Sequence, residues 1–352
     1  MLTQQIERAV VVPALRGLDA VRRSLLWKTR LISRHFVRSR DLRVLGRSLV
    51  ACAGALLLAA YATGYLLLFG PIVLGAAHLV VEARYLVFQP RPNGGVLATV
   101  GVMAAFAAAG LGIYAVGPCT LLALFLLRVR GSGGARRDKW IAGIAALAIG
   151  GSAVAPSWIR FLLLHLHNIL AVAVWAGWRK RPGAVSTAVA CMVGAGAFCV
   201  LAGAFDHVAI RTPVSDHAFS LTKITDAVAA QFHGPWRHRL LIAFAFSQSL
   251  HYAVWLRLVP EEARTRETPR PWSASWAAFK DDVGARTAVV GVLAVLSIPL
   301  LALLLGAVRV RSFYVTASEF HATTELLLVA LLARGVSRGD PSSRRSPSSA
   351  IA

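Results

Sequence analysis

Five histidines lie inside apolar stretches of this 352-residue sequence, and these residues are the ones best suited to chemistry. They are His78, His165, His167, His251 and His321. Ionisable side chains at membrane depth are costly, and where they occur they usually have a function. Imidazole is a common ligand of iron, zinc and copper. Histidines from separate helices therefore predict a metal site in the core of a helical bundle.

Carboxylate and amide side chains recur one helical turn from these histidines. A histidine that binds a metal normally gives its other ring N–H to such a group, which fixes the tautomer. Side chains three or four residues apart share a helix face. We therefore predict four groups that orient the imidazoles: Glu82, Asn168, Gln248 and Glu325.

His165 and His167 are two residues apart, so they point to different sides of one helix and only one is expected to be a ligand. Asn168 shares a face with His165, which favours His165 and leaves His167 as the alternative. The predicted ligands are His78, His165, His251 and His321. Tyr252, which directly follows His251, is the predicted catalytic side chain.

Composition places the chain in a membrane. Its residues are 57% hydrophobic, and the mean hydropathy is +0.62. The 38 Lys and Arg against 16 Asp and Glu give a net charge of +22, but the basic residues lie between apolar stretches. That placement is typical of membrane loops and excludes nucleic acid as a partner. The four cysteines lie in apolar segments without metal-binding spacing, so we interpret them as packing residues.

A spanning helix needs about twenty apolar residues, and the chain offers about ten such stretches. The predicted fold is an all-α polytopic transmembrane bundle, with outer turns at Pro71, Pro118 and Pro156. The expected spans are 48–69, 71–89, 95–115, 117–128, 140–155, 157–178, 183–205, 240–258, 287–308 and 313–334.

With ten spans, the basic clusters fall on one side, which predicts cytoplasmic termini and an integral protein of the bacterial inner membrane. Arg309 and Arg311 are the exceptions, because they fall on the outer side. The four predicted ligands then lie on spans running in the same direction, roughly 10–17 Å below the outer edge.

Three regions flank or interrupt the bundle, which we place at 47–335. Residues 1–46 are predicted as a basic amphipathic segment on the cytoplasmic membrane surface, in contact with lipids. Residues 336–352 are predicted as a disordered cytoplasmic tail. Residues 206–238 form a sizeable outer loop, and whether it acts as a lid stays open.

The predicted chemistry follows from the ligand set. Neutral imidazoles suit iron, zinc or copper, and a four-His Fe(II) centre keeps coordination positions open for dioxygen. A site within hydrocarbon meets only lipophilic substrates, such as a carotenoid, another isoprenoid, a quinone or a lipid. The sequence therefore favours a membrane-embedded non-haem iron oxygenase or oxidase.

The spacing also resembles that of the bacterial Brp/Blh membrane carotenoid-cleaving dioxygenases. In that family the first and last histidines precede an acidic residue by four positions, as His78 and His321 do here, and the third precedes an aromatic residue and then a tryptophan, as His251 does. The resemblance implies iron and a related architecture. The chain departs from it at Ala77, Ser247 and Phe320, and the second histidine element matches only loosely.

Two other functions fit the same residues. A b-type haem protein would use two of the histidines as axial ligands for electron transfer to a quinone. A proton-coupled transporter would use His78, Glu82, His321 and Glu325 as a relay. The metal, the substrate and a homo-oligomeric state stay open.

Overall fold

The structure is a computed structural model that describes residues 5, 7–85, 154–179, 183–208, 221–318 and 321. Every regular element in these ranges is a helix, which confirms the predicted all-α class for this part of the chain. The first elements, with η for a π-helical turn, are η1 (Glu7–Val11), α2 (Val12–Lys28), α3 (Arg30–Arg38), α4 (Arg40–Tyr61), α5 (Thr63–Gly70), η2 (Pro71–Gly75) and α6 (Ala76–Ala83). The later ones are α10 (Pro156–Trp178), α11 (Ala184–Leu201), α12 (Leu221–Ala229), α13 (Pro235–Ala253), η4 (Val254–Leu258), α14 (Val259–Glu262), α15 (Trp272–Val283), α16 (Ala285–Leu305) and α17 (Ala307–Ser318).

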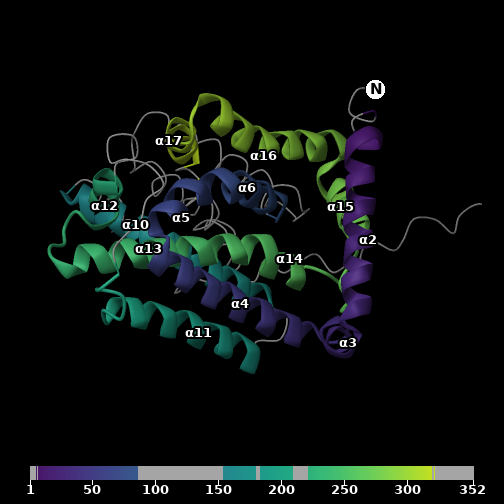
Figure 1. Cartoon of the computed structure of the whole chain (residues 1–352), viewed down its shortest axis with the longest axis horizontal. Coiled ribbons are helices and arrows are strands. Elements are labelled where there is room, and N and C mark those ends of the chain that lie inside the picture. Colours follow the sequence, from purple (N-terminus) through teal and green to yellow (C-terminus); the bar gives the residue numbers. More distant parts are fainter. Residues whose placement is uncertain are drawn as a thin grey trace, which may run out of the picture.

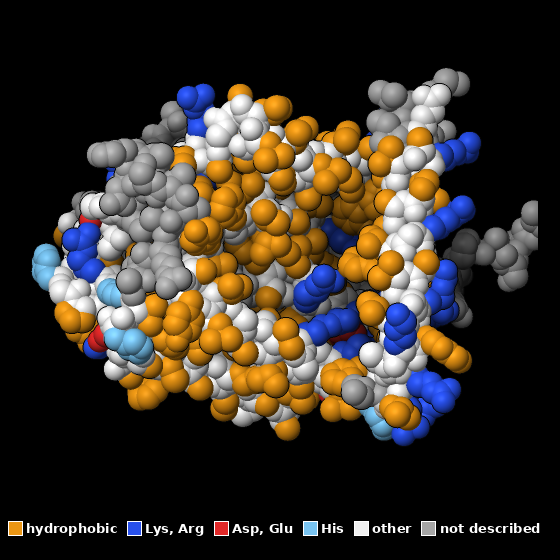
Figure 2. Space-filling view, in the orientation of Figure 1, with side chains coloured by type: hydrophobic (Ala, Val, Ile, Leu, Met, Phe, Trp, Pro, Cys, Tyr) orange, Lys and Arg blue, Asp and Glu red, His pale blue; other side chains and the backbone are white. Residues whose placement is uncertain are grey.

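Four helical stretches are long and apolar enough to cross a membrane: Arg40–Tyr61, Thr63–Ala83, Ala184–Leu201 and Ala285–Leu305. Only 17% of the apolar window of α11 and 11% of that of α16 are buried inside the protein. Apolar helices with so little internal burial need another apolar medium around them, and a bilayer provides it. Hydrophobic side chains accordingly cover the visible face of the bundle (Figure 2).

The predicted boundary between the first two spans is wrong. The sequence placed a turn at Pro71, whereas the helix breaks at Ala62 and then continues from Thr63 to Ala83 through α5, η2 and α6. Pro71 lacks an N–H, and the π-helical turn that begins there changes the local bonding without ending the helix. His78 therefore lies about fifteen residues after the start of its span, instead of about seven.

The other predicted spans coincide with helices where the structure describes them, and among these helices α11 and α16 are long and apolar enough to cross a membrane. Spans 157–178 and 183–205 correspond to α10 and α11, 240–258 to α13 with η4, and 287–308 to α16. The helix predicted at 313 begins earlier, as α17, after Gly306 at a φ of +92°. Spans 95–115 and 117–128, nearly all of 140–155, Glu325 and the tail 336–352 lie outside the described residues. Ten spans and cytoplasmic termini therefore stay predictions.

The N-terminal helix α2 runs across one end of the bundle, roughly perpendicular to the long helices (Figure 1). The backbone N–H groups of Trp272 and Ser273 donate to the Asp19 carboxylate at 2.6 and 3.1 Å, so α2 caps the start of α15. The indole N–H of Trp276 donates to Glu7 at 3.0 Å. The sequence predicted neither α15 nor this contact, and α4 begins at Arg40, inside the predicted surface segment 1–46.

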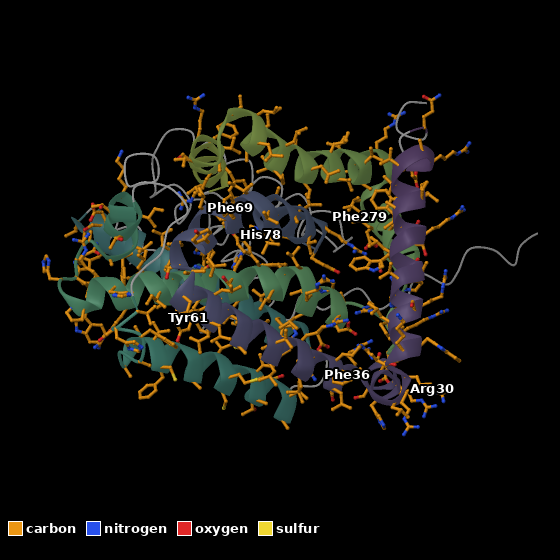
Figure 3. The ribbon with its side chains drawn as sticks, in the orientation of Figure 1. Arg30, Phe36, Tyr61, Phe69, His78 and Phe279 are labelled. Carbon is orange, nitrogen blue, oxygen red and sulfur yellow. The ribbon has the colours of Figure 1, made fainter. Side chains whose placement is uncertain are left out.

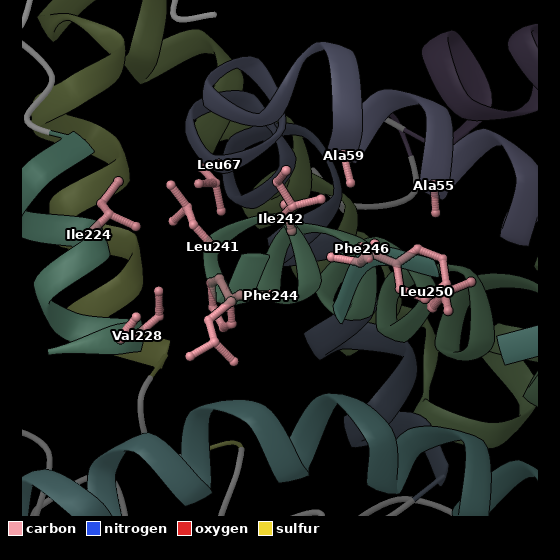
Figure 4. Close-up of a cluster of buried hydrophobic side chains, with 14 of the residues drawn as sticks. Ala55, Ala59, Leu67, Ile224, Val228, Leu241, Ile242, Phe244, Phe246 and Leu250 are labelled. Carbon is pink, nitrogen blue, oxygen red and sulfur yellow. The ribbon is translucent and has the colours of Figure 1, made fainter. Parts of the chain in front are cut away.

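Helix α13 forms the centre of the bundle and packs against α4, α5, α10, α11 and α12. Its buried side chains include Leu241, Ile242, Phe244, Phe246 and Leu250 (Figure 4). Helix α12 comes from the predicted outer loop 206–238, of which residues 209–220 lie outside the described part. This packing fixes the C-terminal end of α13, where His251 lies.

Candidate metal centre

Four imidazoles from four separate segments meet inside the bundle. They belong to His78 on α6, His167 on α10, His251 on α13 and His321 beyond α17. The ring centroids of His78 lie 5.0 Å from His251 and 5.1 Å from His321. His167 lies 5.3 Å from His251 and 5.2 Å from His321. We call these four residues the histidine cluster.

π-helical turns adjoin two of the cluster's helices. Turn η2 ends at Gly75, three residues before His78, and η4 begins three residues after His251. Such turns are rare and occur often at functional sites, because they shift the direction of the following side chains. Gly75 is needed in the first of them, since a Cβ there would overlap the Tyr314 ring. The packing of α17 on η2 therefore depends on glycine.

The geometry fits a metal ion. One nitrogen from each of His78, His251 and His321 lies within 4.8 Å of the other two. Metal–imidazole bonds are about 2.0–2.1 Å long, so small side-chain rotations bring these nitrogens around one ion. Neither ring nitrogen of His78 makes a hydrogen bond of normal geometry with a described residue, and the side chain is 1% exposed. Figure 3 places His78 in the interior of the bundle.

His165, which the sequence analysis favoured as a ligand, lies outside the histidine cluster. Its Nε2 lies 3.0 Å from the Val228 carbonyl of α12, and its ring packs against Phe161 and Phe244. The alternative, His167, occupies the cluster instead. Asn168, which was predicted to orient the His165 ring, instead donates from its side-chain amide to the Leu164 carbonyl of its own helix at 3.0 Å.

One buried stripe of α10 contains His167. His167, Asn168, Ala171, Val174 and Trp175 are all buried, at the spacing of one helix face. The small Ala171 and the large Val174 and Trp175 continue the His167 face toward the C-terminus of the helix. His165 falls off this stripe. Because Leu166 and Ile169 on the exposed face are as apolar as the buried residues, the sequence pattern alone does not separate the two faces, and the burial in the structure identifies His167 as the inward histidine.

Tyr252 lies against the histidine cluster, with its ring centroid 4.8 Å from that of His78. Its hydroxyl accepts a hydrogen bond from the Gln248 amide at 3.2 Å. Gln248 was predicted to orient His251, but the structure pairs it with the tyrosine one turn later. Glu82 is 2% exposed, one turn after His78 on the same helix, and Glu325 lies beyond the described part.

The role of Arg311 was not predicted from the sequence. Its Nε donates to the carbonyl of Leu67. In a regular helix that carbonyl would accept from the N–H of residue 71, but Pro71 has none. Arg311 thus satisfies a backbone group that the proline leaves without its usual partner. Two features of the sequence could have indicated this contact. Pro71 lies in an apolar stretch, where it leaves the carbonyl of residue 67 without a donor, and Arg311 is a basic residue on the predicted outer side.

Comparisons with protein-family models, with curated proteins and with solved structures found no match to this chain. The resemblance to the Brp/Blh dioxygenases therefore stays a prediction from four short stretches of sequence.

Proposed function

We propose that the chain is a membrane-embedded non-haem iron oxygenase or oxidase that acts on a lipophilic substrate. The observation that supports this most directly is the convergence of the four imidazoles, with neighbouring ring centroids 5.0–5.6 Å apart. Ionisable side chains inside a membrane bundle are rare and usually functional, so four imidazoles gathered at one point mark a functional site. A metal ion is the ligand that several neutral imidazoles share.

The donor set is compatible with iron, which is the metal that we assign. Among the described residues the cluster supplies nitrogen and no thiolate, since Cys52 belongs to a separate apolar core and the other two described cysteines are exposed. Thiolate ligands favour zinc, Cu(I) or iron–sulfur clusters, while imidazoles suit iron, with zinc and copper as alternatives. An Fe(II) ion held by these residues would supply redox chemistry with dioxygen. The buried Glu82 is positioned to orient His78 and to offset the charge of the ion.

The packing of the rings argues against the haem alternative. A bis-histidine haem needs two imidazoles on opposite faces of a flat macrocycle. Here His78 contacts His251 edge to face, at an angle of 77°, and His321 at 76°. Rings in mutual contact leave no plane between them for a porphyrin.

The surroundings favour a lipophilic substrate that enters from the bilayer. Helices α11 and α16 bury little of their apolar surface in the protein, so apolar molecules can approach them directly. Tyr252 is the side chain best placed to act beside the cluster, because Gln248 holds its hydroxyl oxygen as an acceptor and leaves its proton free to be donated. We assign it the role of proton donor to the reacting oxygen of the substrate.

Elemental analysis and an absorption spectrum of detergent-purified protein test the proposal. We expect about one equivalent of iron in the wild type, no Soret band, and loss of metal in His78→Ala and His251→Ala. His233→Ala removes an exposed histidine and is the matched control, with unchanged metal content. Less than about half an equivalent of any transition metal in the wild type would refute the metal centre. A Soret band would show that the chain is instead a haem protein. Oxygen consumption with a carotenoid, an isoprenoid or a quinone then tests the activity.

A further inference from the structure

A cleft of about 780 Å³ separates α2 from the end of the bundle. Its walls come from α2, α6, η4, the segment after α14, and α15. Figure 2 shows this hollow beside α2, with basic and acidic side chains at its bottom. We call it the α2 cleft. It is distinct from the histidine cluster, because none of the four histidines lines it.

One wall of the α2 cleft is apolar and open. Leu18, Val21 and Leu25 of α2 line it, and they are 48%, 58% and 57% exposed. Helix α2 runs across one end of the bundle (Figure 1), and an amphipathic helix in that place suits the surface of a bilayer, with its apolar face toward the acyl chains. Acyl chains would cover these exposed leucine and valine side chains favourably.

The charge that lines the cleft is mostly positive. Six arginines line it against two aspartates: Arg22 comes from α2, and Arg47, Arg84, Arg257, Arg264 and Arg270 come from the elements that face α2. Arg84 pairs with Asp282. The Glu261 carboxylate, 1% exposed, is shared by Arg47, Arg264 and the neighbouring Arg43. One buried carboxylate cannot neutralise three guanidinium groups.

Three of the six arginines form no ion pair with a carboxylate of a described residue. Arg22 donates to the Pro269 carbonyl at 3.1 Å, Arg257 lies over the Trp272 ring at 5.6 Å, and the third is Arg270. Burial, and after it repulsion by Arg47, Arg43 and Arg40, lowers the pKa of Arg264 to about 10. An anion in the cleft would relieve this repulsion, and guanidinium groups suit phosphate oxygens because they donate in pairs.

We propose that the α2 cleft binds a phospholipid with an anionic headgroup. Its phosphate lies against the arginine wall, nearest Arg257 and Arg270, and an acyl chain lies along Leu18, Val21 and Leu25. A free phosphate would satisfy the arginines but leave the apolar wall uncovered. A zwitterionic lipid would cover the apolar wall but bring no net charge to the arginines. Only an anionic lipid satisfies both walls.

Native mass spectrometry of the intact chain in detergent tests this with phosphatidylglycerol and phosphatidylcholine of identical acyl chains. We expect the anionic lipid to bind at least about tenfold more tightly, as expected where several basic residues meet an anionic headgroup. The double variant R257Q/R270Q should remove most of that preference while leaving the Glu261 ion pairs intact. The matched control is R16Q/R23Q, which removes two exposed arginines of α2 that do not line the cleft. It should keep the preference.

Two further measurements test the headgroup and the acyl chains of the lipid separately. Glycerol phosphate should not compete at concentrations where phosphatidylglycerol saturates, because it lacks chains. The variant L18S/L25S should weaken both lipids, since it removes the apolar wall without changing the charge. Equal binding of both lipids to the wild type, an equal loss in R16Q/R23Q, or full competition by glycerol phosphate would each overturn the proposal.

Discussion

Replacing His167 by leucine tests which histidine of α10 completes the metal centre. The ring of His167 lies 5.3 and 5.2 Å from those of His251 and His321, so in the proposed metal centre the substitution removes the imidazole that would join the triad His78, His251 and His321. Groups that only orient a ligand already affect metal affinity by about 10–100-fold. A ligand should reach at least the upper end, about 100-fold or about 2.8 kcal/mol at 1.4 kcal/mol per tenfold. Titration of purified protein with Fe(II) against a competing chelator measures this shift.

His165→Leu is the matched control on the same helix. Its Nε2 lies 3.0 Å from the Val228 carbonyl, so the variant leaves that carbonyl without this partner and should lower the free energy of unfolding by about 1–3 kcal/mol. Its metal affinity should equal that of the wild type. The two variants thus separate metal binding from stability. Loss of metal in His165→Leu, with metal retained in His167→Leu, would refute the assignment.

Three other substitutions probe the structure around the site. Gly75→Ala should destabilise the fold by about 1–3 kcal/mol, because the added Cβ overlaps the Tyr314 ring. Arg311→Met should lower the thermal midpoint, because the Leu67 carbonyl loses its donor at a cost of about 1–3 kcal/mol. Hydrogen bonds from Ser273, then Trp272, lower the pKa of Asp19. The α2–α15 contact should therefore be complete above the ordinary carboxyl pKa of about 3.9 and weaken as the pH falls below it.

Each of these predictions has its own control and measurement. Gly54→Ala should be neutral in thermal unfolding, because nothing lies within 4 Å of a Cβ there. Arg309→Met removes an exposed arginine of the same helix, and an equal loss of stability in it would show that the Leu67 contact contributes nothing. For Asp19, amide exchange of α2 relative to intrinsic rates gives the pH dependence. Asp19→Asn should reduce that dependence, and the double variant D19N/E7Q should abolish it, because Lys280 and then Trp276 lower the pKa of Glu7 in the same contact. An unchanged dependence in Asp19→Asn would contradict the role of Asp19.

The sequence was sufficient for the histidine positions because the membrane makes them exceptional. In a bundle whose interior is apolar, His78 and His251 stand out from any apolar background, and each falls in the cluster. The choice between His165 and His167 depended on how α10 is rotated about its own axis, and one neighbouring amide could not decide that rotation. The buried stripe through Ala171 and Trp175 sets it, because many apolar contacts outweigh one hydrogen bond in orienting a helix.

The helix boundaries were harder to predict, because a proline has different effects in water and in a membrane. In a soluble helix, an interior Pro71 would break or kink the chain. In the structure the helix continues through a π-helical turn, and the break falls instead at Ala62, which no local sequence feature indicates. Likewise α15 depends on Asp19, more than 250 residues away in the sequence, for its N-terminal cap. Such a partner cannot be found from local patterns.

Pro71 also accounts for Arg311, one of the two exceptions in the predicted distribution of charge. A carbonyl without a partner is costly in hydrocarbon, and Arg311 supplies the donor that the Leu67 carbonyl lacks. An arginine held this way is placed by backbone chemistry inside the bundle, so the rule that governs loop charges does not apply to it. Arg311 also lies near Tyr252, whose ring contacts His78. The proline, the arginine and the tyrosine therefore connect the irregular helix to the histidine cluster, and a defect at Arg311 should be felt at the site as well as in the fold.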